Sequence, residues 1–135
     1  MSVNPRFTKW KLASALVALA LFLFAVSWLL LAQRHLSEYR YMLFLENSYL
    51  TRAKGEAGKW PVDLVGVEQL LAPKIDSPGE AVFLVHTHRS ARPTLEVIRQ
   101  SESAFDGLVR FHWLGGRAYR IRLDLNRRTA ESAPI

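Results

Sequence analysis

The hydrophobic pattern of the chain begins with an unbroken uncharged run of 21 residues, from Leu12 to Ala32. As an α-helix this run would extend roughly 31 Å, which matches the hydrocarbon core of a bilayer. Trp10 and Trp28 lie near its ends, where indole rings favour the membrane–water boundary. The run is longer than the apolar region of a signal peptide, and no small-residue cleavage site precedes Gln33. The pattern therefore predicts an uncleaved transmembrane helix over residues 12–32.

A second helical pattern follows directly over residues 33–54, which contain neither glycine nor proline. Leu36, Leu43 and Leu50 recur every seven residues and form an apolar stripe on a helix continuous with the transmembrane one. We expect this stripe to make helix contacts. It either covers a sheet of the same domain or packs against another subunit.

The next segment contains turn residues around one short helix. Gly55 and Gly58 end the long helix, and Asp63 is placed to cap a short helix that stops at Pro73. The apolar side chains on one face of this short helix are Leu64, Val67, Leu70 and Leu71. We expect that face to be buried.

After a loop at residues 74–79 the pattern becomes strand-like. The predicted strands are Ala81–His88, Thr94–Ser101, Leu108–Leu114 and Ala118–Leu125. The fold class expected is α+β, with the long amphipathic helix packed on a four-stranded antiparallel sheet. The predicted organisation is a cytoplasmic basic flank (1–11), the transmembrane helix (12–32), the juxtamembrane amphipathic helix (33–54), a small extracytoplasmic α+β domain (55–126) and a flexible tail (127–135).

The last two predicted strands show the clearest alternation of apolar and polar residues. A two-residue loop at Gly115-Gly116 would set apolar side chains opposite arginines. A three-residue loop at residues 115–117 instead gives the apolar pairs Trp113–Tyr119, Phe111–Ile121 and Val109–Leu123. Because the buried face fixes strand register, we predict the three-residue loop.

The opposite face of this hairpin, its tip and the residues after it are strongly basic. The arginines concerned are Arg110, Arg117, Arg120, Arg122, Arg127 and Arg128, with His112 among them. Guanidinium groups in such a set can bind DNA or another polyanion, lipid headgroups or an acidic subunit. The same pattern also fits the solvated side of an amphipathic sheet whose arginine stems cover apolar surface.

The charge distribution predicts an orientation in the membrane. The net charge of +6 comes from three bases without acids before the apolar run and from an excess of three bases over acids in residues 104–135. The three bases before the run are Arg6, Lys9 and Lys11. Because basic residues that flank a transmembrane helix stay on the cytoplasmic side, we expect the N-terminus in the cytoplasm. The chain is then a single-pass inner (plasma) membrane protein with its domain in the periplasm, and the lack of cysteine fits that oxidising compartment.

The sequence offers little catalytic chemistry. His86 and His88 would share one face of the predicted strand, but no cysteine and no clear carboxylate completes a zinc or copper site. Ser101, Ser103 and Asp106 cluster near a turn, where such side chains bind the backbone. No nucleophile elbow, phosphate loop or H-E-x-x-H motif is present. We therefore predict no catalytic residue, no metal, no cofactor and no small-molecule substrate.

One segment between the long helix and the strands carries a family resemblance. Gly55-Glu-Ala-Gly58-Lys-Trp60-Pro61-Val-Asp-Leu64, with the layout around it, resembles type IV pilins and the pseudopilins of type II secretion. Phe7-Thr8 is similar to the start of their mature chains. Arg6 stands where processing of that family requires glycine, and Lys11 stands where the family has glutamate. The resemblance implies an uncleaved, pilin-like relative that stays in the inner membrane.

Together these patterns predict a membrane-anchored, non-enzymatic binding or assembly component of the cell envelope. Its expected partners are the membrane and other membrane or envelope proteins. One alternative is an extracytoplasmic module that binds DNA or another polyanion through the arginines. A second is an accessory subunit of a membrane enzyme complex, whose anchor packs through Ala13, Ala18, Ala20 and Ala25.

Overall fold

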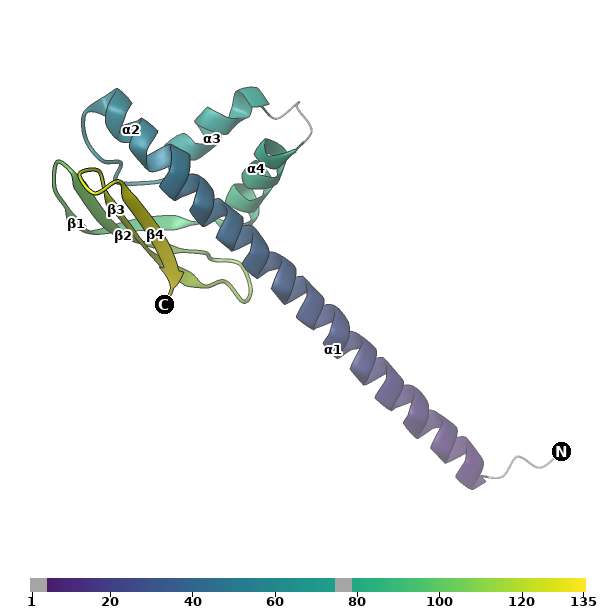
Figure 1. Ribbon diagram of the computed structural model, residues 1–135. Coiled ribbons are helices and arrows are strands. Elements are labelled where there is room, and N and C mark those ends of the chain that lie inside the picture. Colours follow the sequence, from purple (N-terminus) through teal and green to yellow (C-terminus); the bar gives the residue numbers. More distant parts are fainter. Residues whose placement is uncertain (1–4, 75–78) are drawn as a thin grey trace. The chain divides into compact units, whose positions relative to one another are not determined.

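The computed structural model describes residues 5–74 and 79–135, with side chains from residue 8 onward. The chain divides into two units, residues 1–33 and 34–135. Helix α1 (Pro5–Phe44) contributes to both units (Figure 1). Of the loop predicted at residues 74–79, residues 75–78 lie outside the described part of the chain.

The first unit contains the apolar part of α1. Within the described residues, this is the one helix that is long and apolar enough to cross a membrane. Every leucine, valine, phenylalanine and tryptophan of residues 12–32 is exposed, with exposed fractions from 36% to 67%. The length and composition of this helix are compatible with a single transmembrane helix, as the hydrophobic pattern predicts.

In the second unit the helix continues in three parts. The end of α1 is followed by a π-helical turn, η1 (Leu45–Tyr49), and by α2 (Leu50–Ala57). Gly58 ends the helix in the left-handed conformation (φ 74°), and its N–H donates to the carbonyl oxygen of Lys54 at 2.8 Å. The helix predicted over residues 33–54 is confirmed and extends three residues further.

The short helix after the proline turn is also confirmed. It is α3 (Val65–Leu71), and at its start the Val65 N–H donates to Asp63 Oδ1 at 3.3 Å. A 3₁₀ turn, η2 (Ala72–Lys74), follows its end. The predicted apolar face of this helix is packed in the core, with Leu64, Val67 and Leu71 buried and Leu70 partly buried.

One predicted strand is wrong, because residues 81–88 lie in helix α4 (Glu80–Ala91). Its buried residues Leu84, Thr87 and Ala91 recur at helical spacing and not in alternation. The Thr87 hydroxyl donates to the Phe83 carbonyl one turn earlier, at 3.0 Å. A short continuous apolar run fits a strand or a buried helix, and periodicity alone does not distinguish the two.

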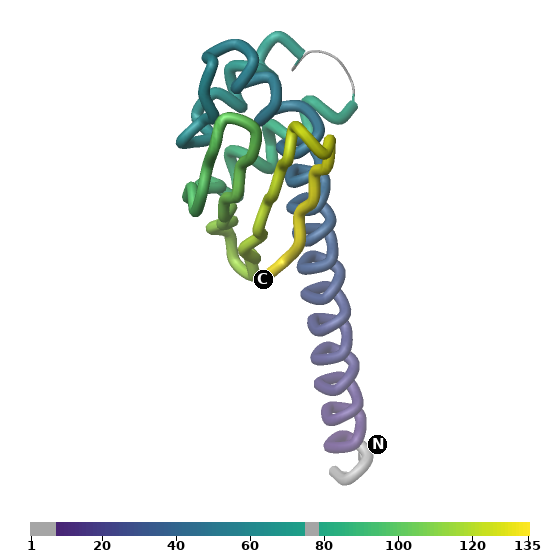
Figure 2. The backbone as a smooth tube through the Cα atoms, turned by 60° about the vertical axis from the view of Figure 1, so that its left-hand side comes forward, coloured from purple at the N-terminus to yellow at the C-terminus, as the bar shows by residue number. Residues whose placement is uncertain are grey.

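The sheet has four antiparallel strands in chain order, β1 (Thr94–Gln100), β2 (Ala104–Arg110), β3 (Ala118–Asp124) and β4 (Thr129–Pro134). Figure 2 shows these strands side by side, coloured from green to yellow. The predicted α+β class with a four-stranded antiparallel sheet is therefore confirmed. The strands that form the sheet differ from the predicted ones. Strand β4 takes the place of residues 81–88, and β2 begins four residues earlier than expected.

Strand β4 corrects the prediction of a flexible tail at residues 127–135. Its backbone pairs with β3 from Asp124 opposite Thr129 to Tyr119 opposite Pro134. Asp124 Oδ1 organises the preceding turn by accepting from the N–H groups of Asn126 (3.0 Å) and Arg127 (3.2 Å). Because the side chains of β4 are mostly small or polar and exposed, the strand has no apolar alternation by which to recognise it.

The register between β2 and β3 is also different from the prediction. Val109 lies opposite Tyr119, not Leu123, and the connection spans residues 111–117 instead of three residues. The change in pairing is an even number of residues, so the predicted apolar face is still the buried one. Phe111 and Tyr119 are buried there, with their rings in edge contact at 5.6 Å.

The core lies between the helices of the second unit and this apolar face of the sheet. Its largest fully buried residues include Tyr41, Met42 and Leu45 from the helix and Val109 and Ile121 from the sheet. The segment after α2 is held by its tryptophan: the Trp60 indole N–H donates to the Ser101 carbonyl at 2.7 Å, and its ring packs 5.3 Å from that of Phe105.

Candidate functional site

The connection between β2 and β3, residues 111–117, forms an ordered loop. The Phe111 N–H donates to the Arg117 carbonyl (3.1 Å), and the Gly116 N–H donates to the Trp113 carbonyl (2.9 Å). A Cβ atom on Gly116 would lie 2.2 Å from the Phe111 carbonyl oxygen, so only glycine fits there. Gly115 adopts a positive φ of 79°. The loop therefore has one backbone shape, which fixes where its side chains point.

This loop and the strand after it surround the carboxylate of Glu38, a fully buried residue of α1. Glu38 Oε2 accepts from the Trp113 indole N–H at 2.9 Å and from the Arg117 backbone N–H at 3.1 Å. Its Oε1 accepts from the Tyr119 hydroxyl at 3.1 Å. Three donors to one carboxylate offset much of the cost of removing its charge from water.

Two neighbouring side chains fasten the same loop to the helix. The Arg34 guanidinium donates from Nη1 to the Leu114 carbonyl at 2.6 Å and lies 5.7 Å from the Trp113 ring centroid. His35 Nε2 is 3.2 Å from the Gly115 carbonyl oxygen, to which it donates when that nitrogen carries the proton. We refer to Arg34, His35 and Glu38, together with the loop 111–117, as the helix–hairpin clasp.

An aromatic cluster packs next to the clasp. The Tyr41 ring makes an edge contact with Phe111 at 5.6 Å and stacks on His88 at 6.0 Å, and the Tyr41 hydroxyl is 2.7 Å from His88 Nδ1. Burial raises the pKa of Tyr41, and burial, followed by the nearby charge of Glu38, raises the pKa of Tyr119 to about 12. Both phenols therefore stay neutral at physiological pH and act as hydrogen-bonding groups.

The candidate histidines are not brought together. Because residues 81–88 form a helix, His86 and His88 do not share a face: His86 is exposed, while His88 contacts Tyr41. Burial lowers the pKa of His88, and the charge of Glu68 opposes that shift. His112 lies on the outward side, with Nε2 2.9 Å from the Thr94 hydroxyl. The described part of the chain contains no group of three or more histidine, aspartate or glutamate residues that could hold a metal ion.

The predicted arginines lie on the outward face of the sheet and at both its ends, interleaved with acids. Arg120 binds Asp106 with two hydrogen bonds, at 3.0 and 2.7 Å, and these hold the pKa of the Asp106 carboxyl below its ordinary value. Arg122 lies 3.9 Å from the same carboxylate and 4.0 Å from Glu131. At one end of the sheet, Arg127 lies 3.9 Å from Asp124.

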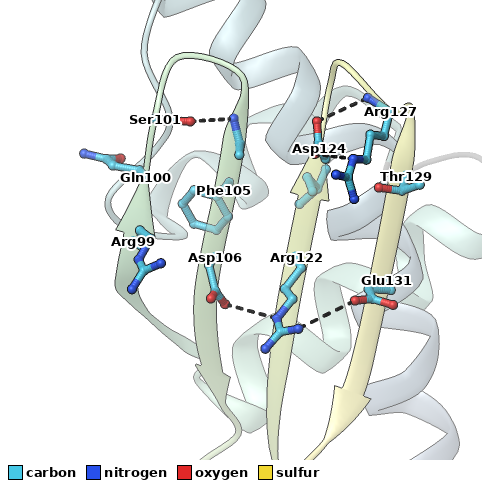
Figure 3. A pocket seen from close by; sticks show the side chains of 12 residues that line it. Arg99, Gln100, Ser101, Phe105, Asp106, Arg122, Asp124, Arg127, Thr129 and Glu131 are labelled. Carbon is cyan, nitrogen blue, oxygen red and sulfur yellow. Dashed lines mark hydrogen bonds and ion pairs between the residues drawn. The ribbon is translucent and has the colours of Figure 1, made fainter.

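Strand register aligns these charges in a row across all four strands. Arg99, Asp106, Arg122 and Glu131 are consecutive cross-strand partners, so positive and negative side chains alternate. Figure 3 shows them around a hollow of about 320 Å³. Arg110, Arg117 and Arg128 are exposed, but Arg117 lies in the loop at the opposite end of the sheet from Arg127 and Arg128. The outward face is thus largely charge-balanced.

The leucines of the predicted helical stripe have different surroundings. Leu36 is 50% exposed, Leu43 is partly buried and Leu50 is fully buried. Leu36 and Leu43 precede the π-helical turn and Leu50 follows it, so the extra residue of that turn rotates Leu50 by about 100° around the helix axis relative to the other two. Tyr39, one helical turn after Leu36, is 54% exposed and shares its face.

Sequence reasoning missed Glu38, which is the most highly connected polar side chain of the domain. A signal for it was present. Glu38 is followed at positions three, four and seven by Tyr41, Met42 and Leu45, all fully buried, so a carboxylate interrupts the true apolar face of the helix. The seven-residue leucine repeat instead predicts a contact face that includes Leu36, which is half-exposed.

Comparison of the chain with protein-family models, with curated proteins and with solved structures finds no match.

The clasp predicts a specific effect of removing the Glu38 carboxylate. Glu38→Met keeps the side-chain volume but leaves the Trp113 and Arg117 N–H groups buried without an acceptor, which should lower the free energy of unfolding by about 2–4 kcal/mol. Glu38→Gln should cost less, because its amide oxygen can still accept from both groups. Chemical unfolding of the full chain in detergent, followed by tryptophan fluorescence, measures this.

The matched control is Glu56→Met on the same helical segment, where the carboxylate is 70% exposed and pairs only with Arg52 at the surface. It should change the free energy of unfolding by less than about 0.5 kcal/mol. Equal effects at positions 38 and 56 would contradict a structural role for the clasp.

Proposed function

We propose that this chain is a single-pass membrane protein of the cell envelope that acts by binding, as a component of an assembly. The observation that carries the proposal is the exposure of every large apolar side chain over residues 12–32. In water, an apolar surface of that extent would be a site of aggregation or association. In lipid it needs no protein partner, and the helix satisfies its own backbone hydrogen bonds.

We further propose that the N-terminus is cytoplasmic and that the domain lies in the periplasm, on the outer side of the inner membrane. The support is the uneven distribution of charge about the apolar helix. Arg6, Lys9 and Lys11 precede it without any acidic residue, while the segment that follows mixes bases and acids. Basic residues close to a transmembrane helix are retained on the cytoplasmic side.

The proposed assembly role is pilin-like. A long N-terminal helix continues into a domain where it packs on an antiparallel meander. Gly58, Trp60-Pro61, the short helix α3 and the helix α4 lie between them. This order of elements supports the resemblance to type IV pilins and pseudopilins. With Arg6 in the position where those proteins are cleaved after glycine, the proposed relative keeps its N-terminal segment and stays in the membrane.

The helix face outside the apolar run supports binding through helix contacts. Leu36 and Tyr39 are half-exposed on one face, whereas Leu50 is used in the core of the domain itself. Catalysis is not proposed, because the buried carboxylate of Glu38 is engaged in three structural hydrogen bonds and the outward arginines largely pair with acids of the same sheet.

Two alternatives keep specific support. A module that binds DNA or another polyanion is favoured by the exposure of Arg110, Arg117 and Arg128, although the alternating charge row reduces the positive potential between them. An accessory subunit of a membrane complex is favoured by small residues on the apolar helix, which permit close helix packing. These residues are Ala13, Ala18, Ala20 and Ala25.

The orientation predicts the behaviour of reporter fusions. Alkaline phosphatase fused after Ile135 should be active in intact cells, since that enzyme folds only after export, and green fluorescent protein at the same position should be dark. Replacing Arg6, Lys9 and Lys11 together by glutamine should lower the phosphatase activity, because it removes the positive charges that keep the N-terminus in the cytoplasm. A fluorescent, phosphatase-negative pair of fusions would overturn the orientation.

The assembly role predicts where a partner is captured. A photo-crosslinking amino acid in place of Leu36 should give a higher-mass adduct in intact membranes, because that side chain is half-exposed on the proposed contact face. The same amino acid in place of Val62, which is 67% exposed elsewhere in the domain, should not. Adducts at Val62 alone, or at neither position, would contradict binding through the helix face.

A further inference from the structure

The clasp contains the first residues of the second unit. Arg34 follows Ala32 by two residues, which is about 3 Å along a helix. Since Arg34 and His35 both contact the carbonyl groups of the loop 111–117, that loop lies level with the first turn after the apolar run. If the run spans the bilayer as proposed above, this turn is at the membrane surface, and the loop is there too.

The loop carries the most exposed large apolar side chain among the described residues. Leu114 is 85% exposed, although its own carbonyl oxygen is fixed by Arg34. The positive φ of Gly115 and the tight packing of Gly116 set the shape of the turn that presents it. Single exposed leucines are common on protein surfaces, so Leu114 points to a membrane contact only in combination with the charges around it.

The charged side chains with exposed surface around Leu114 are of one sign. Residues 33–37 and 110–118 contain three arginines and two histidines, and the one acid of the clasp, Glu38, is fully buried in its three hydrogen bonds. Asp106, Asp124 and Glu131 lie toward the other end of the sheet, where they neighbour other arginines, and Glu96 lies between the two ends, two residues from Thr94. Thus the side chains at the clasp end favour an anionic surface, and those at the far end are balanced.

We propose that the loop 111–117 docks into the headgroup layer of the leaflet in which the anchor ends. Leu114 enters the boundary between headgroups and acyl chains, and the guanidinium groups of Arg117 and Arg34 contact lipid phosphates. The inference rests on the proposed membrane anchor and deepens it, because it adds a second attachment that holds the domain in one orientation on the bilayer.

A depth measurement on the full chain tests this docking. The sequence contains no cysteine, so single cysteines introduced as Leu114→Cys, Val62→Cys and Leu21→Cys can each carry an environment-sensitive fluorophore. The protein is reconstituted into phosphatidylcholine vesicles with a minority of phosphatidylglycerol. In one set of vesicles some lipids carry a nitroxide quencher near the headgroup, and in a second set the quencher is on the acyl chain, where it reaches position 21. The label at position 114 should be quenched about twofold or more relative to the label at position 62.

The three positions separate this inference from the anchor itself. Quenching at position 21 but equal, weak quenching at positions 114 and 62 would overturn the docking of the loop and leave the anchor standing. No quenching at position 21 by lipids labelled at any depth would overturn the anchor and the docking together.

The role of charge is tested in the Leu114→Cys background. Adding phosphatidylglycerol to phosphatidylcholine vesicles should increase quenching. Arg117→Gln should reduce that increase, because it removes one of the two guanidinium groups while the backbone bonds of residue 117 remain. Arg99→Gln, an exposed arginine toward the other end of the sheet, is the matched control and should retain the increase. The same loss in both variants would overturn the contact between Arg117 and the headgroups.

Discussion

A single buried carboxylate connects the long helix of the second unit to its sheet. Glu38 has no exposed surface, and its three donors come from residues 75 to 81 positions later in the chain. A charge removed from water is tolerated only where it is fully hydrogen-bonded, so the helix can bury this face only when the β2–β3 loop closes over it. The position of the hairpin relative to the helix follows from that requirement.

Several other features depend on the same contact. Trp113 leaves the strand ladder to reach Glu38, which ends β2 at Arg110 and lengthens the connection to seven residues. The buried hydroxyl of Tyr119 and the ring of Phe111 are positioned beside Tyr41, and through it beside His88 on α4. One polar interaction therefore joins α1 to the β2–β3 loop, beside the aromatic contacts that reach α4.

The functional proposals draw on the same geometry. The clasp is formed by the first residues after the apolar run, so it brings a basic loop and an exposed leucine to that end of the domain. The outward face of the sheet, which the sequence offers as the strongest binding surface, instead alternates arginines with acids. A domain with one basic, apolar-tipped end fits the proposed role of an anchored binding component.

The sequence predicts those parts of the fold that repeat a simple pattern. Four features can be predicted in this way, because the apolar residues of each recur with one simple spacing. They are the apolar run, the continuous helix, the buried face of α3 and the apolar side of the hairpin. Three features escape such reasoning for physical reasons. Residues 81–88 form a short apolar run that fits either a helix or a strand. Strand β4 is held by backbone hydrogen bonds and has no apolar pattern. The π-helical turn moves Leu50 onto a different face from Leu36.

The candidate site is less predictable than the fold. Glu38 acts through donors distant in sequence, and no local spacing relates it to Trp113 or Tyr119. The arginines are easy to find, but whether they form a positive surface depends on strand register. That register places Asp106 between Arg99 and Arg122, and the sequence-based pairing, which is off by four residues, cannot show this.

The central claim is that Glu38 and Trp113 interact directly and that this contact holds the hairpin on the helix. A double-mutant cycle of Glu38→Met and Trp113→Phe, measured by chemical unfolding of the full chain, tests it most directly. In the Glu38→Met background the Trp113 N–H has no acceptor, so replacing it should cost less than in the parent protein. We predict a coupling free energy of about 1–2 kcal/mol. Additivity within about 0.3 kcal/mol would contradict the account.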